Sequence, residues 1–192
     1  MRTSKIVRTT KETDIVVDLN IDGTGRSNID TGIGFLDHML NLLSFHSSID
    51  LKVICKGDLY IDDHHTVEDI GIVLGQSFRK ALGSRKGIKR YASQYIPMDE
   101  ALCLVAIDIS NRPYIVYNID FTSEKLGEMN TQNFQEFFKS FAYNAGITLH
   151  INLLYGDNDH HKIEAAFKAF ARVLKDAATI VSEEIPSSKG LL

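Results

Sequence analysis

The feature of this 192-residue chain that most constrains its fold is a five-residue motif that occurs twice. Residues 64–68 read HHTVE and residues 160–164 read HHKIE, so both follow the pattern HHxxE and start 96 residues apart (160 minus 64), half the chain length. The similarity extends upstream, where FLDHMLNLLSFHSSIDLKV aligns with NFQEFFKSFAYNAGITLHI and His38 falls opposite Glu136. We therefore interpret the chain as a single domain, residues 1–192, built from two repeats of about 1–93 and 94–192.

Periodicity predicts the same order of elements in both repeats. Short alternating runs of β-branched and apolar residues indicate strands, and an apolar stripe with a 3.6-residue period indicates each long helix. The expected strands are 14–22, 49–55, 101–109 and 147–154, and the expected helices are 35–46, 64–82, 132–144 and 160–182. This arrangement predicts an α+β fold in which helices pack on antiparallel or mixed sheets.

The composition argues against several classes of protein. The chain has 21 basic and 25 acidic residues and a formal charge of −4, whereas general nucleic-acid binders are usually basic. No apolar run reaches the roughly 18 residues of a membrane span, and the start MRTSKIVRTTKETDI lacks the apolar stretch of a signal peptide. Cys55 and Cys103 lie in apolar runs without a CxxC motif, which indicates buried free thiols in a reducing compartment. We expect a cytoplasmic protein with no nucleic-acid or membrane partner.

The two HHxxE motifs carry the most visible chemistry. Positions three and four apart share one helical face, so each glutamate can lie beside a histidine of its own motif. Adjacent histidines point about 100° apart, which lets one pair reach two metal ions. We therefore predict two mixed nitrogen–oxygen metal sites and favour Mn²⁺, because six-coordinate sites with carboxylates suit it. The eight candidate ligands, whose pairing on the two ions the spacing leaves open, are His38, His64, His65, Glu68, Glu136, His160, His161 and Glu164.

Several residues near these motifs have two interpretations. A single His-His pair is more often a surface or core pair than a metal site, and only the second copy of the motif reverses that balance. Asp62 and Asp63 can orient the imidazoles or cap the helix that follows them. His46 lies eight residues after His38 on the same expected helix and can line the site, whereas His150 falls in a strand and is interpreted as structural.

Basic residues form a second set of candidate functional residues. Arg90 ends a short cationic loop (RKGIKR), Arg112 lies in an expected turn, Lys168 projects from the last long helix and Lys189 lies in the C-terminal tail. Each alone is usually a solvated surface charge. Together they can bind a phosphate, for which arginine offers two parallel hydrogen bonds. The tail itself (IPSSKG) has a composition typical of disorder.

Longer motifs resemble those of one enzyme family. They are RTTKETDI, GIGFLDHML, YIDDHHTVEDIGIVLG, PMDEAL, DISNRPY, HHKIEAAFKAFARVLK and IPSSKG, and they cover nearly the whole chain. The chain resembles the imidazoleglycerol-phosphate dehydratases of histidine biosynthesis. The resemblance implies an internal duplication with helices sandwiched between two sheets. It also implies a 24-subunit particle built from trimers, with two Mn²⁺ per active site at subunit interfaces.

The resemblance further implies roles for individual residues. The family's metal positions fall on seven of the candidate ligands, and at the eighth many members have histidine where this chain has Glu136. A carboxylate can replace imidazole on Mn²⁺, so we expect ligation to persist there. Glu12 falls at the family's acid/base position, and the tail is expected to order around the substrate, contrary to its composition. With His46 included, the expected substrate-binding residues are Glu12, His46, Arg90, Arg112, Lys168, Ser187, Ser188 and Lys189.

The implied reaction removes water from imidazole glycerol phosphate to give imidazole acetol phosphate through a metal-stabilised imidazolate. Glu12 would transfer the proton, and the basic residues would hold the phosphate so that the substrate is positioned for reaction. Two other functions stay open on the residues alone. A two-metal phosphohydrolase would release phosphate, and a metal-storage or scaffold particle would bind Mn²⁺ without turnover.

Overall fold

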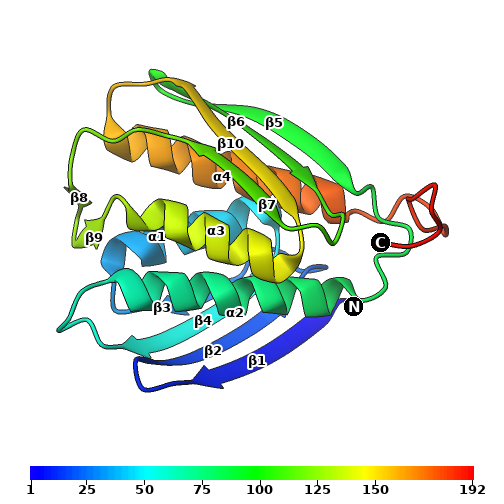
Figure 1. The fold of residues 1–192 in the computed structure, drawn as a ribbon, viewed down its shortest axis with the longest axis horizontal. Helices are drawn as coiled ribbons and strands as arrows, with labels where there is room; N and C mark the ends of the chain where they lie inside the picture. Colours follow the sequence, from blue (N-terminus) through cyan, green and yellow to red (C-terminus); the bar gives the residue numbers. More distant parts are fainter.

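Four helices lie between two four-stranded sheets in the computed structural model, which describes all residues from 1 to 192 (Figure 1). The first sheet has the order β1 (Thr3–Thr9), β2 (Thr13–Asn20), β4 (Asp50–Gly57), β3 (Ser27–Asp30). The second has the order β5 (Tyr91–Met98), β6 (Ala101–Asp108), β10 (Thr148–Tyr155), β7 (Tyr114–Asn118). The helices are α1 (Gly34–Ser47), α2 (His64–Leu82), α3 (Asn133–Ala145) and α4 (Asp159–Ala178), and a small hairpin comprises β8 (Lys125–Leu126) and β9 (Met129–Asn130).

The two sheets have the same topology. In each, the first three strands pair antiparallel, and the last pair, β4 with β3 or β10 with β7, is parallel. Each half of the chain ends its sheet with an equivalent long helix. This helix is α2 after β4 in the first half and α4 after β10 in the second. The fold class is therefore confirmed as α+β, with an internal duplication and helices between two mixed sheets.

Alternation along the central strands builds the two inner faces of the sandwich. In β2 the buried apolar residues are Ile15, Val17 and Leu19, two positions apart, so their side chains share the face that meets the helices. The strand β6 repeats the pattern from Cys103. Burial raises the pKa of the Cys103 and Cys55 thiols to about 12, so both stay protonated at neutral pH.

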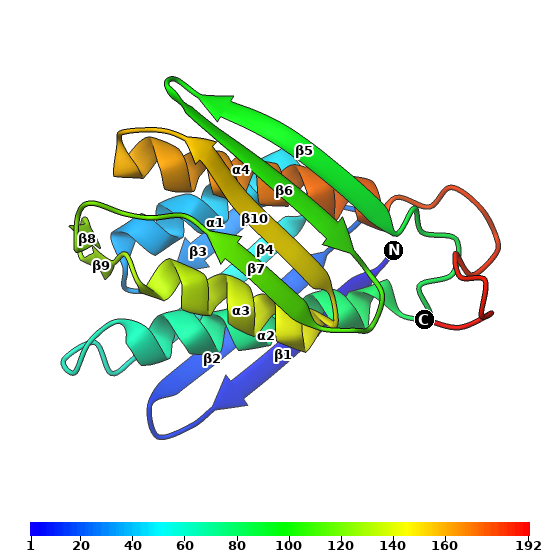
Figure 2. The same cartoon turned by 45° about the horizontal axis from the view of Figure 1, so that its top comes forward.

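Phenylalanines fill the space between α3 and α4. The rings of Phe138 and Phe167 lie 4.8 Å apart, and those of Phe141 and Phe170 lie 5.1 Å apart in an edge-to-face arrangement. Turned by 45°, the strands of the second sheet cross over α3 and α4, the helices that carry these phenylalanines (Figure 2). The middles of these helices are therefore occupied by packing, and only their ends can present functional side chains.

Glycines allow α2 and α3 to approach closely. A Cβ atom on Gly71 would lie 2.7 Å from the Phe137 carbonyl oxygen, and one on Gly75 would lie 2.6 Å from the Phe141 carbonyl oxygen. Both contacts are with backbone, which cannot rotate away as a side chain can. The spacing of four residues places both glycines on the face of α2 that meets α3.

We expect Gly71→Ala to lower the free energy of unfolding by about 1–3 kcal/mol, because the added methyl group forces the helices apart. This loss should outweigh the helix propensity that alanine gains over glycine. Urea unfolding followed by circular dichroism measures the change. Gly34→Ala is the matched control, since a Cβ at Gly34 meets nothing within 4 Å. Equal stability of the two variants would contradict the close-packing argument.

Two sequence expectations need correction. The last helix ends at Ala178 instead of residue 182, because Thr179 is extended (φ −63°, ψ 132°) and Ile180 forms a β-bridge with Ile88. The sequence also missed β1, β3, β5 and β7, which flank the predicted central strands. None of the helices combines the length and apolar character that crossing a membrane requires.

Candidate active site

The helices run in parallel and bring the histidine motifs to one end of the molecule. At that end His64 Nδ1 lies 3.1 Å from Asn133 Oδ1, which joins the starts of α2 and α3. At the other end Lys175 Nζ donates to Ser48 Oγ over 2.7 Å, which joins the last turn of α4 to the cap of α1. The first turns of α2 and α4, where the HHxxE motifs lie, therefore point the same way (Figure 1).

Three candidate ligands meet between α1 and α4. The Nε2 atoms of His38 and His160 lie 3.5 Å and 3.0 Å from Glu164 Oε2, and the ligand atoms of all three residues lie within 4.8 Å of one another. Ligand atoms held at about 2.1 Å from one ion lie about 3–4 Å apart, so this spacing fits a metal ion. Two imidazoles and a carboxylate suit manganese, iron or zinc.

Lys168 borders this cluster, and His46 lies near Lys168. Lys168 Nζ binds Glu164 Oε1 over 2.6 Å. Burial alone would raise the pKa of the Glu164 carboxyl, but hydrogen bonding and charge from Lys168, with further hydrogen bonds from His160 and His38, hold that pKa below its usual value. Burial lowers the pKa of His46, and the charges of Lys168 and Arg172 lower it further. Lys168 therefore lies beside the candidate ligands instead of in the phosphate pocket described below.

The corresponding residues of the first motif are less tightly gathered. His64 Nε2 lies 3.6 Å from Glu68 Oε2, one helical turn away. Glu136 occupies the place on α3 that His38 occupies on α1, but its Oε2 pairs with Lys139 Nζ at 3.1 Å. Glu136 therefore does not join His64 and Glu68 in a three-ligand cluster like that of His38.

The second histidine of the first pair faces different partners from the first. His65 Nδ1 lies 3.0 Å from Asp58 Oδ2, and His65 Nε2 lies 3.8 Å from Glu12 Oε1. The hydrogen bond to Asp58 raises the pKa of His65 despite some burial. Glu12, whose side chain is 52% exposed, therefore stands beside a candidate ligand in the turn between β1 and β2.

The second motif repeats this arrangement with other acids. His161 Nδ1 lies 2.7 Å from Glu100 Oε2, and His161 Nε2 lies 3.7 Å from Asp99 Oδ2. Hydrogen bonds from the Asn158 backbone and from His161 hold the pKa of Glu100 at about 2. Glu100 directly precedes β6 as Glu12 directly precedes β2, so the two glutamates occupy equivalent places in the repeats.

Sequence reasoning missed four of these partners. Asp58, Asp99, Glu100 and Asn133 lie outside both HHxxE motifs, and the available signal was the repeat itself, which pairs Glu100 with Glu12. The aspartates before the first motif anchor the start of the helix, although Asp63 at its N-cap makes no side-chain capping bond. Asp62 accepts a hydrogen bond from the His64 N–H over 2.8 Å, and Asp63 accepts one from the Asn130 N–H, so neither contacts an imidazole.

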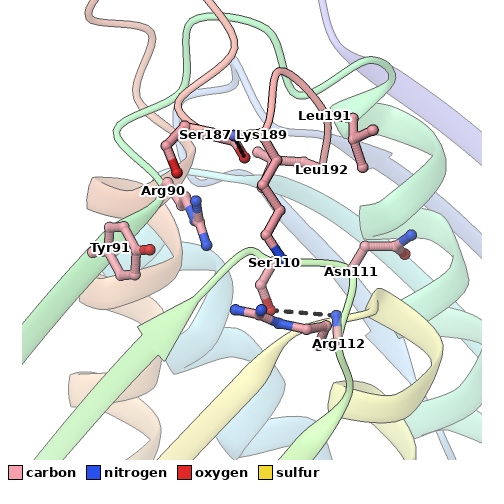
Figure 3. A pocket seen from close by; sticks show the side chains of 10 residues that line it. Arg90, Tyr91, Ser110, Asn111, Arg112, Ser187, Lys189, Leu191 and Leu192 are labelled. Carbon is pink, nitrogen blue, oxygen red and sulfur yellow. Dashed lines mark hydrogen bonds between the residues drawn. The ribbon is translucent and has the colours of Figure 1, made fainter.

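A basic pocket of about 400 Å³ lies at the opposite end of the molecule (Figure 3). Arg90 Nε donates to Asp108 over 2.7 Å, a hydrogen bond that raises the pKa of Arg90, and its Nη1 donates to the Pro186 carbonyl over 2.7 Å. The tail is thereby folded over the pocket. Five of the expected substrate-binding residues line it, namely Arg90, Arg112, Ser187, Ser188 and Lys189.

The histidine cluster and the basic pocket are far apart within one chain. The Arg90 N–H donates to the Ala177 carbonyl over 2.9 Å, in the last turn of α4, whereas His160 lies in its first turn. Seventeen residues of helix (177 minus 160) span about 25 Å. A small substrate cannot touch both places on the same chain.

Comparison with solved structures defines the class of protein. The chain superposes on imidazoleglycerol-phosphate dehydratase from Staphylococcus aureus with a TM-score of 0.85 and 43% identity, covering 93% of this chain and 99% of that one. It superposes on the Pyrococcus furiosus enzyme with a TM-score of 0.85 and 37% identity, covering 97% and 100%. The fold is thus that of a hydro-lyase, an enzyme that eliminates water.

The chain belongs to the imidazoleglycerol-phosphate dehydratase family. The sequence model of that family matches residues 31–174. The imidazoleglycerol-phosphate dehydratase of Clostridioides difficile is 65% identical over 192 residues, the full length of both chains. That of Caldicellulosiruptor saccharolyticus is 58% identical over 191 residues, covering 100% of this chain and 98% of the relative.

Proposed function

We propose that this chain catalyses the manganese-dependent dehydration of imidazole glycerol phosphate to imidazole acetol phosphate and water, a step of histidine biosynthesis in the cytoplasm. The observation that carries the proposal is the meeting of His38, His160 and Glu164, in a family of dehydratases, at a spacing that suits a metal ion. The basic pocket around Arg90 and Arg112 supports a phosphorylated substrate. The buried free thiols accord with a reducing compartment.

Two Mn²⁺ per active site would use the two repeats alike. His38, His160 and Glu164 form one ligand set, and the repeat assigns Glu136, His64 and Glu68 to the other. The second histidine of each motif contacts acids outside its own set, Asp58 for His65 and Glu100 for His161, and would ligate the other ion. Bound Mn²⁺ would supply Lewis-acid stabilisation of charge on the substrate's imidazole ring.

The chain's own residues would supply positioning and proton transfer. Arg90, Arg112 and Lys189 hold the phosphate, with hydroxyls from Ser187 and Ser188 beside them. Glu12 serves as acid/base because its exposed carboxylate lies beside His65 and can reach a substrate placed there. Lys168 lies next to Glu164 and adds positive charge near the ligands. His46, whose lowered pKa favours the neutral imidazole, would line the site as an uncharged hydrogen-bonding group.

We propose that each active site is built at an interface between copies of this chain. The 25 Å between the two ends of α4 exceeds the length of a substrate made of one ring, three carbons and a phosphate. One copy would therefore present the histidines and a neighbouring copy the phosphate pocket. The family resemblance gives this assembly as a 24-subunit particle built from trimers.

Assays of metal-free and Mn²⁺-reconstituted protein with imidazole glycerol phosphate test the function directly. We expect ketone formation with Mn²⁺ and none without it. Release of inorganic phosphate in place of ketone would favour the two-metal phosphohydrolase. Tight Mn²⁺ binding without any turnover would favour a metal-storage or scaffold particle, and either result would reject the dehydratase.

Glu100 is expected to position His161 for metal binding, since an acid on the far ring nitrogen fixes the orientation of an imidazole ligand. We predict that Glu100→Ala lowers Mn²⁺ affinity about 10–100-fold. Titration of Mn²⁺ into metal-free protein measures this. Asp18→Asn, which removes an exposed carboxylate on β2, is the control. Unchanged affinity in the Glu100 variant would remove the positioning role.

A further inference from the structure

A second cationic cavity lies next to the basic pocket. Its volume is about 680 Å³, and it opens between the ends of α2 and α3. Asn111 and Leu192 line both cavities. Figure 3 shows the Asn111 and Arg112 side chains leaving their shared turn in opposite directions, so Arg112 serves the basic pocket while Asn111 turns toward this second cavity.

Arg85 is the unusual member of this cavity. It is only 6% exposed, and it forms no ion pair with any carboxylate. Its Nε atom is buried without a hydrogen-bond partner, and its Nη2 reaches only Asn111 Oδ1, at 3.4 Å. A buried guanidinium without an anion is costly, because its lost hydration is not replaced.

Neighbouring basic residues add to the unpaired positive charge of Arg85. Arg79 and Lys80, in the last turn of α2, also line the cavity, and neither pairs with an acid. Burial lowers the pKa of Arg85, and the positive charge of Arg79 lowers it further. The carbonyl end of α3, at Gly146 beside Arg85, offsets part of this charge but provides no full negative charge.

We propose that this cavity binds a small oxyanion of the phosphate or sulfate class, held by the guanidinium groups of Arg85 and Arg79 and by the side-chain amide of Asn111. The anion supplies the negative charge that the Arg85 guanidinium lacks, since its one side-chain hydrogen bond is to the neutral Asn111 Oδ1. Lys80 contributes charge at the rim. This site is separate from the pocket of Arg90 and Arg112, and its existence does not depend on the chemistry proposed for the histidines.

Binding of inorganic phosphate to the intact, metal-loaded protein tests the site. Arg112→Ala weakens the basic pocket, and in that background we expect phosphate binding to persist. Adding Arg79→Gln should then weaken it about tenfold, the loss expected for a hydrogen bond to a charged group. Arg79 is exposed, so this change should leave the fold intact. Lys86→Gln is the control. It removes an exposed charge next to Arg85 in sequence but outside the cavity, and it should leave phosphate affinity unchanged.

Crystals soaked in selenate, an oxyanion with a strong anomalous signal, locate the anion. A peak beside Arg85 that disappears in Arg79→Gln supports the site. The proposal is overturned if the Arg112→Ala protein binds no phosphate, if Arg79→Gln and Lys86→Gln have equal effects, or if anomalous peaks occur only elsewhere. In those cases Asn111 and the carbonyl end of α3 suffice for Arg85.

Discussion

Glu12→Gln is expected to lower kcat for ketone formation by about 10²–10⁴-fold, the usual contribution of a positioned acid/base group. Glutamine keeps the size of the side chain but cannot exchange a proton. The Glu12 carboxylate lies 3.8 Å from His65 Nε2 and is half exposed, so its loss removes little packing. His65 keeps its other partner, Asp58, at 3.0 Å.

Metal content separates proton transfer from metal binding in this variant. We expect Glu12→Gln protein to bind as much Mn²⁺ as the wild type, measured by elemental analysis after dialysis. Asp18→Asn, an exposed carboxylate on the same sheet at β2, is the control and should keep full activity. Normal turnover of the Glu12 variant would reject the acid/base role, and loss of Mn²⁺ with activity would reassign Glu12 as a ligand.

The helices that carry the histidines were predictable from the sequence. The limits 64–82 expected for the first long helix are those of α2, because its apolar stripe begins directly at the motif and ends at Gly83. The missed strand β5 carries Tyr91 and Tyr95 on its outer face, both more than half exposed. Alternation of exposed aromatic and half-buried residues does not separate inside from outside, so the pattern could not indicate a strand clearly.

The site was predictable in its ligand types but less so in its geometry. The repeat identifies His160 and Glu164 because both lie within one helical turn. Glu100 reaches His161 only because the turn between β5 and β6 folds back over the start of α4, a contact between residues 61 positions apart. The pairing of Glu136 with Lys139 was equally hidden, since either a ligand or a surface ion pair fits its place on α3.

Mixing two inactive variants is expected to restore activity if the site is shared between copies. Glu12→Gln and Arg112→Ala alter opposite ends of the chain, and each alone should be nearly inactive. Random co-assembly of equal amounts would leave about one quarter of the sites with an intact Glu12 from one copy and an intact Arg112 from another. Co-expressed, differently tagged chains, purified through both tags, would show this recovery in kcat.

Recovered activity would exclude a site contained in one chain. If Glu12 and Arg112 acted on the same substrate from the same copy, every copy in the mixture would carry one defect, and no active site would form. The separation of about 25 Å along α4 makes that arrangement incompatible with so short a substrate. Particles that contain both chains yet show no recovered turnover would therefore overturn the shared site. Recovery near one quarter would show that the chain becomes an enzyme only through its neighbours.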